Sequence, residues 1–129
     1  MNSENTQIIH SPFDDSAKAR QYRMGLISID GAPDNNAIAV LAHVYAGLFY
    51  DNLCDYFEDM EHTENICSRL SEMRKSVSSQ KLLLAICMQY DMMQKQLPEP
   101  IWWIVGNSAL VELFAGEFLD CLRTLQKAV

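Results

Sequence analysis

The sequence predicts an all-α protein: a single compact bundle of four to five helices, with room for one minor short strand pairing. Three observations predict this fold. Apolar residues recur at helical spacing along most of the chain, helix-capping or helix-breaking residues separate these segments, and only one short run has the character of a strand. The 129 residues contain no repeat, low-complexity tract or linker, so we expect one helical domain over residues 13–129.

The N-terminal region is the least regular part of the pattern. Residues 1–12 are polar and lack periodicity, which is typical of a flexible tail. Asp14 and Asp15 favour the start of a short helix that ends near Arg23, because acidic residues at the start of a helix complement its dipole. Residues 26–29 (Leu-Ile-Ser-Ile) are the best strand candidate, although a lone strand needs a partner.

A long helix is predicted from 35 to 60, with Asp34, Asn35 or Asn36 as its N-cap. The apolar residues of its first half form two faces, one of Ile38, Leu41, Val44, Tyr45 and Leu48 and the other of Ala39, Ala42 and Ala46. We therefore expect this half to be the central helix, with apolar contacts on both sides. Its longest apolar run, 37–50, is shorter than the roughly 20 residues that span a bilayer, which indicates a buried helix and no membrane span.

Two helices follow, from 63 to 76 and from about 79 to 96. The first has apolar residues at helical spacing, namely Ile66, Leu70, Met73 and Val77. Cys67 lies at the buried edge of that stripe. Ser78 or Ser79 caps the second helix, which is apolar nearly all round from Leu82 to Met93. We therefore expect this helix to be mostly covered.

The C-terminal part begins at Pro98-Glu99-Pro100, which ends the preceding helix. Residues 101–105 fit either a strand or a first helical turn behind Pro100. Beyond Gly106 an apolar stripe predicts a last helix from 108 to 127, formed by Leu110, Phe114, Phe118, Cys121 or Leu122, and Leu125.

The start of the chain and the cysteines indicate a cytoplasmic protein. The first 15 residues contain no Lys or Arg and no apolar run of the length that a secretory signal needs. The cysteines at 54, 67, 87 and 121 show no C-x-x-C pairing, so we expect them to be reduced and buried.

No catalytic, cofactor or metal motif rises above background. A dimetal carboxylate bundle needs two Glu-x-x-His pairs, and Asp59-x-x-His62 is the single acid-to-His pair at that spacing. His43 beside Cys54 or Cys87 is the one nucleophile pairing that the sequence leaves open, and a packed histidine is the simpler interpretation. None of the five glycines belongs to a phosphate-binding loop. We expect no enzyme, no cofactor and no metal.

The net charge is concentrated in one third of the chain. The total is −7, which weighs against direct binding to nucleic acid. Residues 24–68 contain eight acids and no Lys or Arg, and six of the acids fall within 14 residues: Asp51, Asp55, Glu58, Asp59, Glu61 and Glu64. They form either a merely solvated face or a docking surface for a basic partner.

Trp102 and Trp103 are adjacent, so in a helix or a strand they point in different directions and cannot easily share one core. We therefore expect one of them to be an anchor at an interface or to lie partly buried beneath a loop. Four methionines favour core filling or, as the alternative, an adaptable groove: Met73, Met88, Met92 and Met93.

These observations predict a small acidic regulatory or inhibitory protein that sequesters a basic partner, such as a nucleic-acid-binding regulator. It would act as an anti-activator or as a mimic of nucleic acid, through the six acids and with Trp102 or Trp103 at the partner or dimer contact. We expect a homodimer. The alternative is a secretion chaperone or a toxin-immunity protein that binds its partner through an apolar groove of Met and Trp side chains.

Overall fold

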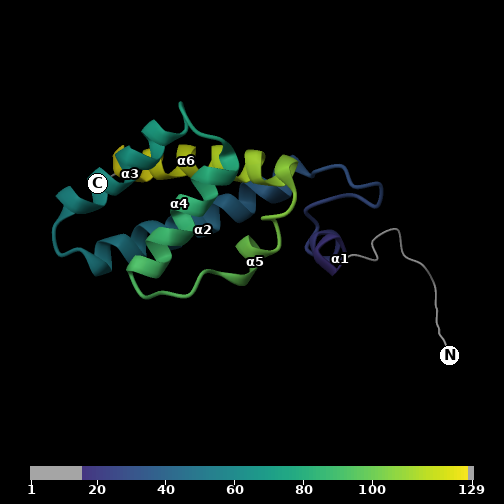
Figure 1. The fold of residues 1–129 in the computed structure, drawn as a ribbon, viewed down its shortest axis with the longest axis horizontal. Helices are drawn as coiled ribbons and strands as arrows, with labels where there is room; N and C mark the ends of the chain where they lie inside the picture. Colours follow the sequence, from purple (N-terminus) through teal and green to yellow (C-terminus); the bar gives the residue numbers. More distant parts are fainter. Residues whose placement is uncertain (1–15, 128–129) are drawn as a thin grey trace.

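The computed structural model describes residues 16–127. This part of the chain contains six helices and the segments that connect them (Figure 1). The helices are α1 (Ser16–Arg23), α2 (Asn35–Tyr56), α3 (Met60–Met73), α4 (Ser79–Met92), α5 (Glu99–Trp102) and α6 (Ser108–Lys127). The predicted all-α fold is confirmed. The count exceeds the predicted four to five because 99–102 forms a one-turn helix with Pro100 in its first turn. The predicted tail, 1–12, lies outside the described residues.

The helices α2, α3 and α4 each begin at a side-chain N-cap. The carboxylates of Asp34 and Asp59 and the hydroxyl of Ser78 each accept a hydrogen bond from the backbone N–H three residues ahead. The apolar pattern predicts that the long helix ends at residue 60, but α2 ends earlier. Because Asp59 caps α3, α2 ends at Tyr56 and residue 57 takes an extended conformation.

The strand candidate at 26–29 forms no strand within residues 16–127. It makes a single antiparallel bridge, between Ile27 and Pro33, around a tight turn. The backbone N–H of Ser28 donates to the carbonyl of Ala32, and that of Asp34 donates to Leu26. Gly31 has a φ of +90°, a conformation that favours glycine. The predicted strand pairing is therefore reduced to one bridge, which joins α1 to α2.

Helix α6 is central to the bundle because it packs against α2, α3 and α4. Its apolar stripe is buried over most of its length, at Leu110, Val111, Phe114, Ala115, Phe118, Leu119 and Leu122. We predicted that the first half of α2 would be the central helix, and this is wrong. The side of α2 that carries Ile38, Ala42 and Ala46 packs into the core, while the opposite side is in contact with solvent.

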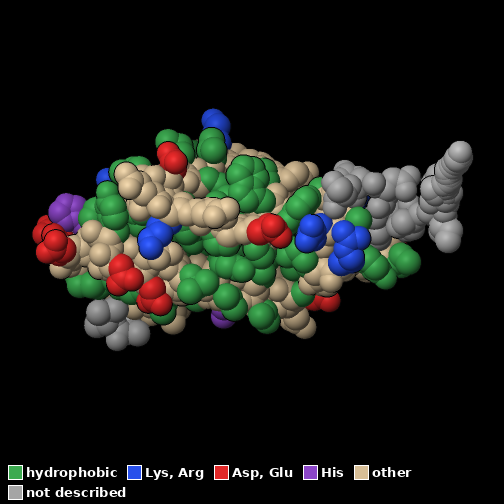
Figure 2. All heavy atoms as spheres, turned by 90° about the horizontal axis from the view of Figure 1, so that it is seen from below, with side chains coloured by type: hydrophobic (Ala, Val, Ile, Leu, Met, Phe, Trp, Pro, Cys, Tyr) green, Lys and Arg blue, Asp and Glu red, His purple; other side chains and the backbone are tan. Residues whose placement is uncertain are grey.

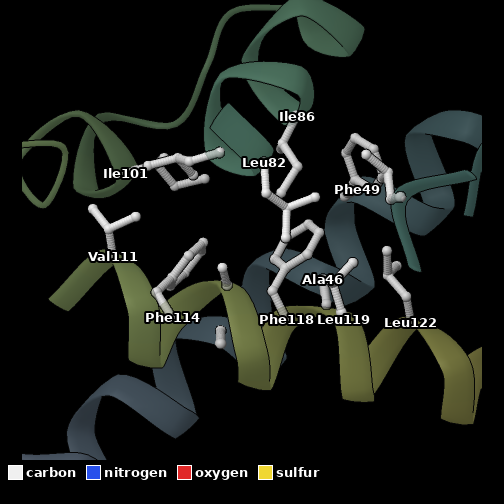
Figure 3. Close-up of a cluster of buried hydrophobic side chains, with 14 of the residues drawn as sticks. Ala46, Phe49, Leu82, Ile86, Ile101, Val111, Phe114, Phe118, Leu119 and Leu122 are labelled. Atoms are coloured by element: carbon white, nitrogen blue, oxygen red, sulfur yellow. The ribbon is translucent and has the colours of Figure 1, made fainter. Parts of the chain in front are cut away.

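Aromatic rings fill the space where α2, α4 and α6 meet. The ring centroid of Phe49 lies 5.4 Å from that of Phe118 and 5.5 Å from that of Tyr90, with tilted planes. Figure 3 shows Ala46 on α2 beside Phe118 and Leu119 of α6. A methyl side chain at this position lets the two helix axes approach closely.

A buried polar network attaches α1 to the start of α6. The side chain of Gln21, which is fully buried, donates to the carbonyl oxygen of Trp103 and accepts from the side chain of Asn107. Asn107 in turn accepts from the backbone N–H of Leu110, so it caps the first turn of α6. The guanidinium of Arg20 stacks on the ring of Trp103, 4.7 Å from its centroid.

We predict that Ala46→Leu destabilises the protein by roughly 1–3 kcal/mol, because three added carbons must fit between two helices that are already in contact. Urea denaturation measures the change. Ala109→Leu, at an exposed position of α6, is the matched control and should change the free energy of unfolding by less than about 0.5 kcal/mol. Equal effects of the two variants would contradict the close α2–α6 packing.

Gln21→Leu should destabilise the protein by roughly 1–3 kcal/mol, because it leaves a buried carbonyl and the amide of Asn107 without partners. Arg23→Leu, at an exposed position of the same helix, serves as the control. If both leucine variants unfold at the same urea concentration as the wild type, the network does not hold α1 in place.

Candidate protein-binding surface

The six acids of the predicted site lie where α2 ends and α3 begins, at one end of the molecule. All six are exposed: Asp51, Asp55, Glu58, Asp59, Glu61 and Glu64. Figure 2 shows acidic side chains beside a histidine at this end, and apolar side chains across the middle of the same face. The acids differ, however, in what they do within the structure.

Two of the acids stabilise the start of α3. Asp59 accepts a hydrogen bond from the backbone N–H of His62, and a ring nitrogen of His62 lies 2.9 Å from the same carboxylate oxygen. The His62 ring also stacks on Phe57 at a centroid distance of 5.2 Å. These bonds to His62 hold the pKa of Asp59 below its usual value of 3.8, the backbone bond being the largest cause. Glu61 lies in the first turn of α3, where the helix dipole favours a negative charge.

Asp51, Asp55 and Glu58 have no such role. The last turn of α2 contains no basic residue, and Asp55 lies in that turn, where the dipole disfavours an acid. Within residues 16–127 no Lys or Arg forms an ion pair with any of the three. Local stability therefore does not explain these acids.

An apolar stripe on α2 continues directly into these acids. Val40, Val44 and Leu48 are spaced four residues apart and are 64%, 51% and 48% exposed. At 100° per residue, they and the two acids Asp51 and Asp55 lie within an arc of about 80° on the outward side of α2. This face was predicted to be covered, and that prediction is wrong: α6 covers the opposite side of the helix, and within the described residues nothing packs over this one.

The two tryptophans occupy different environments. Trp102 is 62% exposed, whereas Trp103 is half-buried beneath the guanidinium of Arg20. Both lie in or beside α5, away from the junction of α2 and α3 along the length of the molecule (Figure 1). The structure therefore does not bring the tryptophans and the six acids into one contiguous site.

A second apolar face follows α4, which was predicted to be mostly covered. Leu84, Met88 and Met92 point away from the core and are 58%, 61% and 61% exposed. The prediction fails because α4, like α2, has a single covered side. Of the four methionines, Met93 is buried and Met73 is half-buried, so core filling applies to these two.

Within residues 16–127 the nucleophile pairing that the sequence left open, His43 with Cys54 or Cys87, does not form. His43 is exposed and its Nε2 lies 3.8 Å from a carboxylate oxygen of Glu117, so no described contact joins it to Cys54 or Cys87. Burial raises the pKa of every cysteine thiol, that of Cys67 to about 12, which keeps the thiols protonated at neutral pH. Among residues 16–127 no group of three or more His, Cys, Asp or Glu side chains is arranged to hold a metal ion.

Helix α2 has the length and apolar composition to cross a membrane, and within residues 16–127 it is the one helix that does. This is weak evidence for a membrane span, because the core helix of a water-soluble bundle passes the same test. One side of α2 does lie in the core, where Ala42, Ala46, Phe49 and Leu53 are fully buried.

Sequence reasoning missed Val40, Val44, Leu48 and Leu84 as surface residues. One signal could have found the first three. Asp51 and Asp55 must face solvent, and extending their side of the helix back by whole turns leads to these three apolar residues. The same signal exists for α4, because Lys81 and Asp91 must also face solvent and lie within about 60° of Leu84 around the helix.

The Asp59 cap predicts a pH dependence. Because its folded-state pKa is lowered, the ionised carboxylate contributes stability above about pH 3.8 that is lost as the pH falls through the lower folded-state value. Asp59→Asn keeps a capping oxygen but cannot ionise. Between pH 6 and pH 3 the free energy of unfolding should fall more steeply for the wild type than for this variant, as measured by urea titration. Parallel curves would contradict the role of the charge.

Comparisons with protein-family models, with curated proteins and with solved structures found no match to this chain.

Proposed function

We propose that the protein is a small acidic binding protein that sequesters a partner with a basic surface, such as a nucleic-acid-binding regulator. It does so through the outward face of α2. The observation that carries the proposal is the continuity of three exposed aliphatic residues, Val40, Val44 and Leu48, with two acids that no described base neutralises, Asp51 and Asp55.

The two halves of this face serve different parts of recognition. The aliphatic stripe supplies apolar surface area, and the burial of this area by a partner contributes favourable binding free energy. The acids attract a basic surface over several ångströms, speed the encounter and disfavour acidic competitors. A partner that matches both halves carries apolar side chains next to Lys or Arg residues.

A second copy of the chain does not satisfy this face. Residues 24–68 contain no Lys or Arg, so two α2 faces placed together would bring acids and apolar residues but no compensating charge. The lack of compensating charge therefore disfavours a dimer in which two α2 faces pair, and we propose a different protein as the partner at α2. The predicted homodimer would use another surface. Light scattering of the purified protein measures the molar mass and so distinguishes a dimer from a monomer.

The partner is captured first, by a photo-crosslinking amino acid at position 44 in the native host, and is then purified. Asp55→Lys should weaken the affinity of the purified partner about tenfold, because it replaces an attractive charge with a repulsive one. Glu112→Lys makes the same change in net charge on an exposed part of α6 and should alter the affinity less than twofold. Binding measured by calorimetry at 0.15 M and at 0.5 M salt should weaken at the higher salt. Affinity that ignores both Asp55→Lys and salt would overturn the proposal.

An alternative function is favoured by the exposed face of α4. A secretion chaperone or toxin-immunity protein would hold an apolar segment of its partner there, against Leu84, Met88, Met92 and Trp102. Methionine side chains adapt their shape to such segments.

The two functions differ in what disrupts them. With the purified partner, the alternative predicts that Met88→Ala combined with Met92→Ala weakens binding at least tenfold and that salt has little effect. The α2 proposal predicts that this double variant binds within about twofold of the wild type, because both residues lie on another helix.

A further inference from the structure

A cavity of about 750 Å³ opens between α4 and the chain that follows it, from residue 95 to residue 105. From α4 its lining includes Leu83, Leu84, Cys87 and Tyr90. From the other side it includes Leu97, Trp102 and Val105. The volume lies within the range of about 300–1,000 Å³ that is typical of small-molecule sites.

Charge is confined to a few of the lining residues. Burial raises the pKa of Tyr90 to about 12 and also raises that of Cys87, so both groups are neutral at neutral pH. The charged lining residues are Lys81 near the start of α4, and Asp91 and Lys95 near its end. The cavity thus carries one net positive charge, on a protein whose total is −7.

We propose that this cavity binds a long-chain carboxylate, with the alkyl chain along the apolar lining and the anionic group at a lysine, Lys81 or Lys95. The apolar lining suits the alkyl chain of the ligand, and the one ammonium group in excess attracts its carboxylate. The ligand would also cover part of Trp102 and Leu84, which otherwise remain more than half exposed.

The apolar lining of the cavity favours an alkyl chain over a peptide segment. An alkyl chain is thinner and brings no backbone N–H or C=O groups that would lose their hydrogen bonds to water on burial.

Titration calorimetry of the full chain with decanoate, dodecanoate and tetradecanoate, each below its micelle concentration, tests the ligand class. We expect one ligand per chain, and each further CH₂ that is buried should tighten binding roughly threefold to fourfold. Dodecyltrimethylammonium has a similar chain with a positive head group and should bind at least tenfold more weakly than dodecanoate. Equal affinity for the two head groups, the absence of any chain-length dependence, or binding only to vesicles that contain the acid would overturn the proposal.

The chain offers a matched pair of variants for the apolar lining. Leu84→Ala combined with Trp102→Ala removes two lining side chains and should weaken dodecanoate binding at least tenfold. Met88→Ala combined with Met92→Ala removes two side chains of similar exposure on α4 that lie outside the cavity lining, and should leave the affinity within twofold. All four residues are exposed, so circular dichroism should report a folded protein in both cases. Equal losses would indicate adsorption to the apolar surface of α4 and would overturn the cavity site.

A second pair tests the charge. Lys81→Gln combined with Lys95→Gln should abolish the preference for dodecanoate over dodecyltrimethylammonium. Arg69→Gln combined with Arg123→Gln makes the same change in net charge at exposed positions outside the lining and should preserve the preference. Binding of dodecanoate and binding of a partner at α2 are tested separately. Asp55→Lys should leave the affinity for dodecanoate within twofold of the wild type.

Discussion

The burial of one helix, α6, is the constraint on which the rest of the structure depends. Its apolar stripe is covered from Leu110 to Leu122, and α2, α3 and α4 all pack against it. Because α2 and α4 pack mainly against α6, each of them has one covered side. The aromatic contact of Phe49 with both Phe118 and Tyr90 joins α2 and α4 above α6. The polar network of Gln21 attaches α1 to the start of the same helix.

This arrangement leaves apolar residues of α2 and α4 in contact with solvent. Stripes of this kind are uncommon on monomeric proteins and mark contact sites when polar groups border them. The two surfaces differ in their charged neighbours: the α2 stripe leads to Asp51 and Asp55, while two lysines and one aspartate line the cavity beside α4. The same packing thus produces two surfaces whose charged residues have opposite net sign.

Much of the fold was predictable because its causes are local. Asp34 and Ser78 cap α2 and α4, and each was among the caps predicted for its helix. Pro100 lies in the first turn of α5, as one of the two predictions for that segment had it. The prediction that Pro98 ends the preceding helix at residue 96 is wrong, because α4 ends at Met92 and Gln94 takes a φ of +58°. The end of α2 was not predicted correctly. The apolar spacing through residue 60 fits one helix, but Asp59 lies inside this segment and caps α3. For the candidate site, the exposure of the six acids could be predicted from their charge. Some of these acids stabilise α3 and others do not. This division could not be predicted, because it depends on where α3 begins.

The sequence by itself determined the approximate position of most helices, the candidate caps of α2 and α4, most of the buried stripe of α6 and the concentration of acids between Asp51 and Glu64. Each of these follows from residue spacing or from contacts within a few residues. Only the tertiary structure decided that α6 and not α2 is central, which tryptophan is exposed, and which sides of α2 and α4 face water. A helix that is apolar on most sides carries no local information about which side its partners will cover, because that choice depends on residues far away in the chain.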